Sequence, residues 1–465
     1  MAERLKKSIL YTYGVADMFF LLLADLELFY FTIFLTDYAR FSMATGAIIL
    51  SVTGVVDIVC AFIAGIILQK ATLKFGGKYR SWFLIGPPLF APLFVLQFTK
   101  IGGELSAAFI IIFCFLTSHL LWNVVYTASG AMVNRLSRLP EEITILSNNR
   151  AQGMSAAGLI FSVAGWPLIM FFAAHTSEVT GFTLATTAFA ICMILGYWYV
   201  YKITAGKDPY EESPAADSKN EAGRSVRETI RLVLDNPPLL WLVTAETFRN
   251  TYYAILMAFA VYYFKYVLKD LAFLSVFLLA TSIAALMGSF AATWIGVKFG
   301  KRHSYWVFLI LAAAGSAAAR LPGLTPWSFT GICSIATFVA GIASAMSTGL
   351  FSDTVVYGEW KTGKNIRAFT MSLANVAIKL SILIRSVTVI LGLAAIGFIS
   401  NAVPSPKVVN GITSIMTLAP AAACLLAAVI FYAGYKIEDK HVLRMQDEIA
   451  ARTAGEFASV NDLMP

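Results

Sequence analysis

The feature that most constrains this sequence is the repeated occurrence of long apolar stretches. A helix of about 20 apolar residues spans the ~30 Å hydrocarbon layer of a bilayer. Stretches of this length recur from Tyr11 almost to the C-terminus, and about twelve of them can be counted. The sequence therefore predicts an all-α membrane protein that crosses the bilayer about twelve times.

The predicted spans fall into two sets of six. Those of the first set lie near residues 11–35, 45–69, 82–99, 105–133, 151–174 and 179–202. Those of the second set lie near residues 237–266, 271–297, 303–319, 327–350, 368–400 and 410–435. The long runs at 105–133 and 368–400 could each be one tilted span with an extension, so about eleven to thirteen spans fit the sequence.

A polar linker at residues 204–231 separates the two sets. The predicted domains are an N-terminal six-helix bundle at 1–203, a C-terminal six-helix bundle at 232–436 and a cytoplasmic tail at 437–465. Residues 73–82 resemble residues 297–306, because each segment joins glycine to basic residues after the second span of its set. Glycine with basic residues is common in any tight loop, but the equivalent positions favour duplicated six-helix halves, as in alternating-access carriers.

The formal charge of +8 is distributed unevenly along the chain. Most of the basic residues lie in alternate short loops: Lys6, Lys7, Lys70, Lys74, Lys78, Arg80, Arg135, Arg138, Lys298, Lys301, Arg302, Lys361, Lys364, Arg367, Lys436, Lys440 and Arg444. The positive-inside rule then places both termini in the cytoplasm of a multi-pass protein of the cell (inner) membrane. The net positive charge is explained by the orientation of the chain in the lipid bilayer, which places basic residues in the cytoplasmic loops. We therefore expect no nucleic-acid partner.

Neither the N-terminal segment nor the cysteines indicate a cleaved signal peptide, a disulfide framework or a zinc site. The first span is too long for the apolar region of a signal peptide, so we expect it to remain in the protein. All the cysteines fall within apolar spans and none has CxxC spacing, so they read as buried thiols: Cys60, Cys114, Cys192, Cys333 and Cys424.

Ionisable residues inside the predicted spans are the strongest candidates for function. A charge at the bilayer centre costs roughly 2.5 to 3.5 kcal/mol on insertion scales, so it normally faces a cavity or a partner. These residues are Asp17, Asp25, Glu27, Asp57, Glu246, Arg249, Lys379 and Arg385. The acids gather in the N-terminal half and the bases mostly in the C-terminal half.

Helix geometry sorts these charges by direction. Asp17 and Asp25 share a stripe with Leu21, whereas Glu27 lies about 200° from Asp25 and must face something else. Lys379 and Arg385 are about 240° apart around their helix, so we expect them to contact different neighbours, at least one of them an acid from the other half.

Two of the charged sites allow a local interpretation. Glu246 and Arg249 are three residues apart, which suits an ion pair that is simply stabilising. Asp57 has no basic neighbour in its span. A buried carboxylate of this kind is either protonated or holds a cation, so Asp57 is a candidate for binding a coupling ion, H⁺ or Na⁺, against the alternative of a structural hydrogen bond.

The segment at residues 353–364, DTVVYGEWKTGK, is highly distinctive. It resembles the cytoplasmic loop after the tenth span of the glycoside-pentoside-hexuronide:cation symporter family, the melibiose-permease branch of the major facilitator superfamily. Further matches extend over the chain: Tyr13-Gly14, Thr36-Asp37, residues 78–82, Leu121-Trp122, Tyr126-Thr127 and residues 262–264. The resemblance implies twelve helices in two pseudo-symmetric six-helix bundles and solute uptake driven by Na⁺, H⁺ or Li⁺.

The resemblance also assigns a cation site. Asp57 matches the first carboxylate of the family's site, and Thr127 matches the hydroxyl that assists it. The second carboxylate falls at Ala61, which favours H⁺, or no coupling, over Na⁺.

The substrate site implied by the resemblance has lost its acids. The family's sugar-binding carboxylates fall at Leu21 and Gly130, while Arg150 and Lys379 match basic residues of the family. The expected substrate-binding residues are Asp17, Asp25, Tyr126, Arg150, Asn250 and Lys379. A site that keeps bases and loses acids favours an acidic solute, such as a uronide, over a neutral galactoside.

The residue 353–364 segment is also expected to act as part of a cytoplasmic gate. As a loop facing the basic turns it can form salt bridges that break and re-form as the halves rock, although a solvated loop is the alternative. The expected gate residues are Arg80, Asp353, Tyr357 and Glu359.

These expectations define a secondary active transporter for a glycoside or acidic sugar, coupled to H⁺ or Na⁺ and working as a monomer. The alternative is an uncoupled facilitator, or a carrier of a non-sugar organic anion or lipid-like solute. No enzymatic activity and no cofactor are expected, because the sequence has no HExxH, GxSxG or GxxxxGK[ST] and its histidines are scattered.

Overall fold

The computed structural model describes residues 4–70, 76–137, 139–208, 231–364 and 367–461. Helices form all of the regular secondary structure in these residues, and no strand occurs among them. Most of the predicted linker, residues 209–230, lies outside the described residues.

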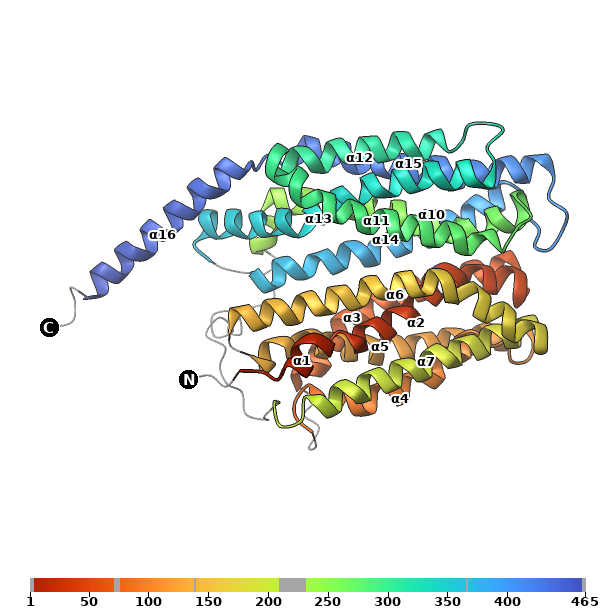
Figure 1. Ribbon diagram of the computed structural model, residues 1–465, viewed down its shortest axis with the longest axis horizontal. Helices are drawn as coiled ribbons and strands as arrows, with labels where there is room; N and C mark the ends of the chain where they lie inside the picture. The colour runs from red at the N-terminus through yellow and green to blue at the C-terminus, as the bar shows by residue number, and fades with distance from the viewer. Residues whose placement is uncertain (1–3, 71–75, 138, 209–230, 365–366, 462–465) are drawn as a thin grey trace. The chain divides into compact units, whose positions relative to one another are not determined.

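The helices follow the two predicted sets (Figure 1). In the first set lie α1 (Lys7–Thr12), α2 (Val15–Ile33) with the π-helix η1 (Phe34–Tyr38), α3 (Met43–Lys70), α4 (Arg80–Gln97), α5 (Glu104–Leu136), α6 (Pro140–His175) and α7 (Glu178–Ile203). In the second set lie α10 (Pro237–Tyr262) with the π-helix η2 (Tyr263–Val267), α11 (Phe273–Phe299), α12 (Lys301–Ala318), α13 (Pro326–Thr362), α14 (Arg367–Ala395) and α15 (Pro406–Gly434). The tail forms α16 (Asp439–Asn461).

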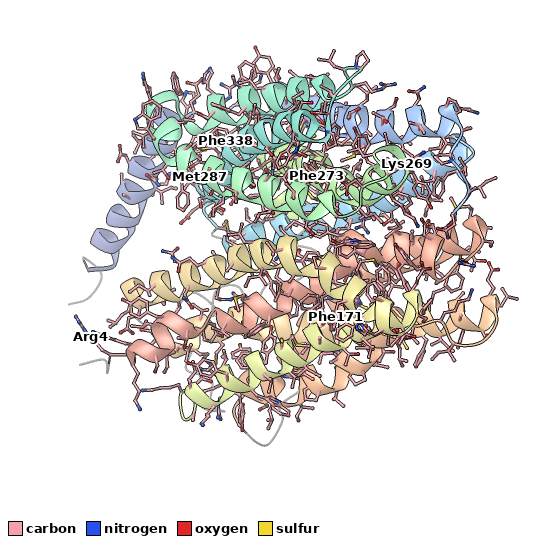
Figure 2. The ribbon with its side chains drawn as sticks, turned by 45° about the vertical axis from the view of Figure 1, so that its right-hand side comes forward. Arg4, Phe171, Lys269, Phe273, Met287 and Phe338 are labelled. Atoms are coloured by element: carbon pink, nitrogen blue, oxygen red, sulfur yellow. The ribbon has the colours of Figure 1, made fainter. Side chains whose placement is uncertain are left out.

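Many of these helices have the length and surface of membrane spans. Nine candidate spans occur among the described residues. The three other helices at predicted spans are less apolar: α4 contains three prolines, α10 contains Glu246 and Arg249, and α12 begins with Lys301 and Arg302. Large apolar side chains are exposed along the helices (Figure 2), with Phe171 at 59% and Met287 at 54%. The protein is therefore a multi-pass membrane protein.

The structure divides into two compact units. Unit 1 comprises Met1–Glu212, Met257–Ser282 and Leu383–Thr413. Unit 2 comprises Ser213–Leu256, Ile283–Ile382 and Ser414–Pro465. Segments of α10, α11, α14 and α15 thus belong to unit 1 together with the first set of helices.

In unit 1, α2 packs against α6 and α7, and α4 packs against α5 and α7 (Figure 1). Aromatic side chains fill the space between α2 and α5: the ring centroids of Phe20 and Trp122 are 3.7 Å apart, and those of Phe20 and Tyr126 are 5.2 Å apart. This aromatic packing fixes the α2 face on which Asp17 lies.

The predicted internal repeat is visible as matching contacts. At the start of α4, Arg80 Nε donates to Tyr201 O at 2.7 Å, and at the start of α12, Arg302 Nε donates to Tyr435 O at 3.0 Å. Each acceptor lies at the end of the last helix of its set. The same glycine-plus-basic turn therefore makes the same bond in both halves.

The first helix of each set ends in the same way. η1 continues α2 and η2 continues α10, and each π-helix is followed by a non-glycine residue with positive φ, Arg40 at 52° and Lys269 at 56°. Such backbone is uncommon for side chains of this size. Its occurrence at equivalent positions confirms the pseudo-symmetry of the two halves.

The residue 353–364 segment is not the loop that was predicted. α13 continues as a helix to Thr362 and ends at Gly363, which has φ 67°. The segment contains no proline, and Gly358 within it remains helical; the helix ends only at Gly363, which adopts the left-handed conformation common at helix ends. The predicted gate residues Asp353, Tyr357 and Glu359 therefore lie on a helix.

α16 contacts the end of α13 in unit 2. Trp360 Nε1 donates to Glu448 Oε2 at 2.7 Å, and Arg452 Nη1 donates to Trp360 O at 2.9 Å. The bonds from Trp360 and from Arg444 lower the pKa of the Glu448 carboxyl below its ordinary value. The predicted tail is thus a helix that is attached to α13.

Candidate functional site

Asp17 and Arg150 form an ion pair inside unit 1. Arg150 Nε donates to Asp17 Oδ2 at 2.8 Å, and Arg150 Nη2 donates to Asp17 Oδ1 at 2.9 Å. Asp17 is 0% exposed, and Ser129 Oγ lies 3.4 Å from both of its carboxylate oxygens. Two predicted substrate-binding residues, one on α2 and one on α6, thus lie together in a bidentate pair.

A close approach of two backbones positions this pair. The Gly14 N–H donates to Asn149 Oδ1 at 2.6 Å. A Cβ at Gly14 would lie 2.2 Å from Asn149 O, and a Cβ at Gly153 would lie 2.3 Å from Gly14 O. Because glycine has no Cβ, the α2 and α6 backbones can meet here, and Arg150 reaches Asp17 one turn further along.

One nitrogen of the Arg150 guanidinium is not used by Asp17. Arg150 Nη1 has no hydrogen-bond partner within the described part of the chain. A Cβ added at Gly130 would lie 3.3 Å from this nitrogen. The guanidinium carbon lies 5.7 Å from the centroid of the Tyr126 ring. The site therefore presents a cationic donor beside an aromatic ring, at the position where the resembling family has an acid.

Asp25 does not join this pair. It is 7% exposed, and its carboxylate has no hydrogen-bond or ion-pair partner among the residues that the structure describes. Asp17 and Asp25 share the predicted stripe of α2, but only Asp17 contacts a basic side chain. The two expected substitutes for the lost sugar-binding acid are thus in different environments.

Asp57 contacts an asparagine on α5. Asn123 Nδ2 donates to Asp57 Oδ1 at 3.2 Å and to His119 O at 2.7 Å. Thr127, the expected assistant of the cation site, lies one turn further along α5 and is exposed. Asn123 of α5 therefore supplies an amide donor to Asp57.

Glu27 meets a histidine on the same helix. His119 Nε2 lies 3.1 Å from Glu27 Oε2, with side chains 6% and 20% exposed. The His119 ring stacks on Phe115 with ring centroids 3.6 Å apart. Glu27 faces α5 while Asp17 pairs with α6, which confirms that the acids of the first span do not share one wall.

Arg385 from α14 lies near Glu27. Arg385 is 4% exposed, its Nη1 donates to Leu28 O at 2.6 Å, and it interacts electrostatically with Glu27. Its Nε is buried and has no hydrogen-bond partner in the described structure. The expectation that a base of this span contacts an acid of the first half stays a prediction: Arg385 bonds the backbone of Leu28 beside Glu27 and feels the charge of Glu27.

Unit 2 contains a separate charged group on α10 and α12. Arg249 Nε donates to Glu246 Oε1 at 2.9 Å and Arg249 Nη2 donates to Glu246 Oε2 at 2.7 Å, which confirms the predicted local pair. Tyr305 OH donates to the same carboxylate at 2.7 Å. The predicted binding residue Asn250 accepts a bond from Arg249 Nη2 at 3.0 Å. Lys379, also predicted, is half-buried on α14.

The predicted gate residues bond within their own units. In unit 1, Arg80 stacks on the Tyr201 ring at 3.7 Å from its centroid. In unit 2, Lys301 Nζ donates to Asp353 Oδ1 at 2.7 Å, and Tyr357 and Glu359 are half-buried on α13. The basic turn beside α12 therefore pairs with the acid of α13, as expected for a basic turn facing this segment.

A second polar group of unit 1, here named the Asp37 cluster, consists of Thr36, Asp37, Tyr262, Lys265, Tyr266, Ser400 and Asn401. Asp37 is 0% exposed. Lys265 Nζ donates to Asp37 Oδ2 at 2.6 Å, Tyr266 OH donates to the same oxygen, and Ser400 Oγ donates to Oδ1 at 3.0 Å. One buried carboxylate thus joins three segments that are far apart in the sequence.

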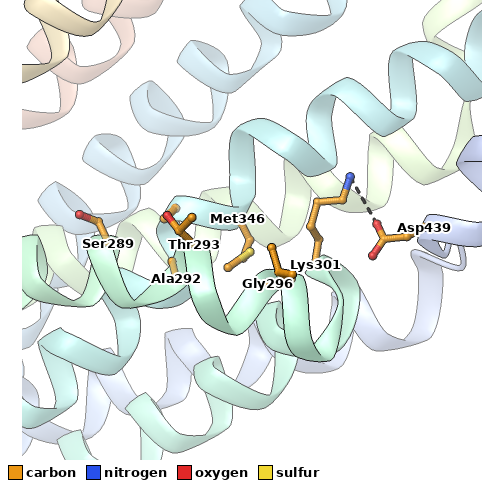
Figure 3. A pocket seen from close by; sticks show the side chains of 9 residues that line it. Ser289, Ala292, Thr293, Gly296, Lys301, Met346 and Asp439 are labelled. Atoms are coloured by element: carbon orange, nitrogen blue, oxygen red, sulfur yellow. Dashed lines mark ion pairs between the residues drawn. The ribbon is translucent and has the colours of Figure 1, made fainter.

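Unit 2 also contains an open cavity of about 400 Å³ (Figure 3). Residues of α11 and α13 line it, together with the first residue of α12, Lys301, and the first residue of α16, Asp439; Lys301 Nζ and Asp439 Oδ1 form an ion pair at 3.4 Å. None of the predicted substrate-binding residues lines this cavity. Within the described residues, no group of three His, Cys, Asp or Glu side chains is placed to hold a metal ion.

Sequence reasoning missed His119, Asn123 and the Asp37 cluster. His119 and Asn123 are four residues apart on an apolar helix, so they share a face. Histidine inside an apolar span is rare and a functional candidate by default, and this was the signal that could have identified it. The partners of Asp37 depend on tertiary packing, and no local pattern indicates them.

Repeated helical halves with ionisable side chains held inside membrane-spanning helices define a transporter of small solutes. Residues 12–439 match the model of the MFS/sugar transport protein family, and the chain belongs to this family. The resemblance found from the sequence motifs is thereby confirmed.

Similar proteins agree with this family. The chain is 26% identical over 455 residues to a putative sulfoquinovose importer of Salmonella typhimurium, covering 97% of this chain and 94% of the relative. It is 26% identical over 444 residues to a putative 2,3-dihydroxypropane-1-sulfonate exporter of the same organism, covering 95% of each chain. The crystal structure of a D-xylose-proton symporter has the same fold, with a TM-score of 0.67, 14% identity and coverage of 92% of this chain and 98% of that one.

Proposed function

We propose that this protein is a secondary active transporter that carries an acidic, sugar-like solute across the cell (inner) membrane together with a cation. It acts by alternating access of its two halves, with both termini in the cytoplasm, as a monomer and without enzymatic activity. The Asp37 cluster then lies at the outer face, and the basic turns before α4 and α12 lie at the inner face.

The observation that carries the proposal is the state of Arg150. Its Nε and Nη2 are held by Asp17, while Nη1 points toward Gly130, where a sugar-binding acid is missing. A carboxylate or sulfonate of a solute can accept a bond from Nη1, and the Tyr126 ring offers a surface for the apolar face of a sugar.

The names of two relatives support an anionic solute, whereas others are named for the neutral sugars isoprimeverose and lactose. The two are named for sulfoquinovose and for 2,3-dihydroxypropane-1-sulfonate, and both compounds carry a sulfonate group. A sulfonate has no proton to donate at neutral pH, so it needs donors and positive charge from the protein. Arg150 provides both.

A solute panel tests this proposal. The purified protein is heated with sulfoquinovose, methyl β-D-glucuronide or neutral methyl β-D-galactoside, and the Tm is recorded. A ligand at 100 times its Kd stabilises the folded state by about 2.7 kcal/mol, so an acidic solute is expected to raise the Tm. Stabilisation by the galactoside alone would contradict the proposed charge preference.

A second candidate function is export or facilitated passage of a small organic anion, which the exporter among the relatives favours. Proteoliposomes separate the two functions. Solute accumulation that depends on an imposed ion gradient supports symport, whereas uptake that only reaches equilibrium, with or without ionophore, supports a facilitator.

A further inference from the structure

Four ionisable side chains from four helices lie around one region of unit 1: Glu27 on α2, Asp57 on α3, His119 on α5 and Arg385 on α14. Resting on the proposed function, we infer that the coupling ion is a proton and that the Glu27 and His119 side chains carry it. Asp57 and Arg385 are the charges that respond to its arrival and release.

The hydrogen bonds of His119 fix where the proton resides. His119 Nδ1 lies 3.1 Å from Phe115 O and 3.3 Å from Ser118 Oγ. Because a carbonyl oxygen only accepts, we assign the hydrogen to Nδ1, which then donates to Phe115 O. The other ring nitrogen, Nε2, lies 3.1 Å from Glu27 Oε2. If neither group held a proton, two lone pairs would face each other at this distance. With this tautomer, the 3.1 Å pair corresponds to the loaded form of the proposal, with one proton between Nε2 and Oε2.

Arg385 allows the pair to lose that proton. Its guanidinium is 4% exposed, and a buried charge needs a compensating partner. Glu27 is the acid with which Arg385 interacts. When the proton leaves, the carboxylate charge of Glu27 is balanced by Arg385. Asp25, on the same helix, lies about 200° away and faces elsewhere.

Asn123 links this pair to Asp57. Its Nδ2 donates to both Asp57 Oδ1 and His119 O, and since both acceptors are oxygens the amide must present its NH₂ group to them. A metal cation such as Na⁺ needs oxygen ligands instead, and the next turn of α3 after Asp57 carries Ala61. Asp57 thus receives an amide donor from Asn123, while the proton of the proposal resides on the Glu27–His119 pair.

In each transport cycle the Glu27–His119 pair then binds and releases one proton. The pair takes one proton from water on the side where the solute binds and releases it to water on the other side. Only N–H and O–H bonds at His119 Nε2 and Glu27 Oε2 form and break. Loading removes a negative charge beside Arg385. This change in the electrostatic interaction between α2 and α14 shifts the equilibrium between the conformations of the transporter.

A spectroscopic experiment tests the pair without any solute. The full chain is labelled with ¹⁵N-histidine, and the His119 signals are identified by their loss in His119→Gln. We expect Nδ1 to stay protonated across the pH range and Nε2 to titrate at a pH that shifts in Glu27→Gln. An unshifted Nε2 titration in Glu27→Gln would overturn the assignment.

A transport experiment tests the coupling. Proteoliposomes with internal pyranine receive external sulfoquinovose, and internal pH, concentrative uptake and exchange are measured. We expect solute-driven internal acidification, and at least a tenfold fall in the ratio of concentrative uptake to exchange in Glu27→Gln and His119→Gln. The matched control is His175→Gln: His175 Nδ1 lies 2.7 Å from Phe171 O in the same way, but the side chain is exposed.

The two experiments separate failure of the inference from failure of the proposed function. Accumulation that requires Na⁺, or an unchanged ratio in both variants, overturns the proton site while symport stands. Absence of any transport by the parent protein overturns the proposed function, and the ¹⁵N titration still decides whether Glu27 and His119 share a proton.

Discussion

Gly130 lies beside the Nη1 group of Arg150, so a side chain added there would meet the guanidinium. Arg150 is already held by Asp17 through its other two donors. The proposed preference for acidic solutes thus depends on Gly130, a position without a side chain.

Gly130→Asp is expected to weaken binding of an acidic solute at least tenfold, about 1.4 kcal/mol. The new carboxylate would occupy Nη1 and repel an anion. Isothermal titration with the acidic solute of the panel measures the effect. Gly130→Ala is the control, because its Cβ meets only the end of a flexible side chain, and we expect less than a threefold change. Equal affinity in the aspartate variant would contradict the role of Nη1.

Part of the site could be predicted from the sequence, because the free-energy cost of a charged side chain inside the membrane marks it as a functional candidate. Asp17, Glu27 and Asp57 stand out as charges inside predicted spans, whereas Arg150 was indicated only by the family resemblance; helix periodicity separated the faces of Asp17 and Glu27. Which helix supplies each partner depends on tertiary packing, so the pairing of Glu27 with His119 became visible only in the structure.

Among the helices, α6 shows how backbone contact positions a site. Gly153 approaches the Gly14 carbonyl so closely that a Cβ would lie 2.3 Å from it, whereas a Cβ at Gly158 meets nothing within 4 Å. The two glycines lie on the same helix about one and a half turns apart, and only one is required by packing.

Gly153→Ala is therefore expected to destabilise the protein by on the order of 1 to 3 kcal/mol through overpacking. It also moves Arg150 away from Asp17, so binding of the acidic solute weakens. Gly158→Ala should stabilise by up to about 1 kcal/mol through helix propensity. Thermal unfolding of both variants in detergent checks this, and equal Tm values would contradict the close approach.

The attachment of α16 to α13 is expected to depend on pH. The folded pKa of Glu448 is lowered by Trp360 and Arg444, so its contribution is present above the ordinary glutamate pKa of about 4.3 and is lost as the pH falls through the lowered value. Acrylamide quenching attributable to Trp360, obtained by difference from Trp360→Phe, should rise on acidification. Glu448→Gln should abolish this pH dependence, and an unchanged profile would contradict the assignment.

At the scale of the whole molecule, the sequence predicted the helical class, the two sets of spans and their internal repeat. Apolar stretches follow the thickness of the bilayer, and basic residues follow the orientation of the loops. The sequence did not predict the π-helices at the ends of α2 and α10, nor the Asp37 cluster. Residues 36–37, 262–266 and 400–401 have no local pattern that links them, and only packing brings them together.

Loss of the Asp37 carboxylate should destabilise the protein, since it leaves Lys265 without its acid. Asp37→Ala is expected to cost on the order of 3 kcal/mol, somewhat less for Lys265→Ala because that side chain is 19% exposed. The double variant should cost less than the sum of the two single changes. Thermal unfolding of the four proteins measures this coupling, and strict additivity would show that the pair contributes nothing.

The length of α13 has a mechanical consequence. Its 37 residues make a rod of about 55 Å, while the hydrocarbon layer is only ~30 Å thick. A tilt of this rod about a pivot within the bilayer is magnified at its protruding tip, where Trp360 and α16 are attached. A fluorophore at that tip would report sub-ångström rearrangements near the pivot as displacements several times larger.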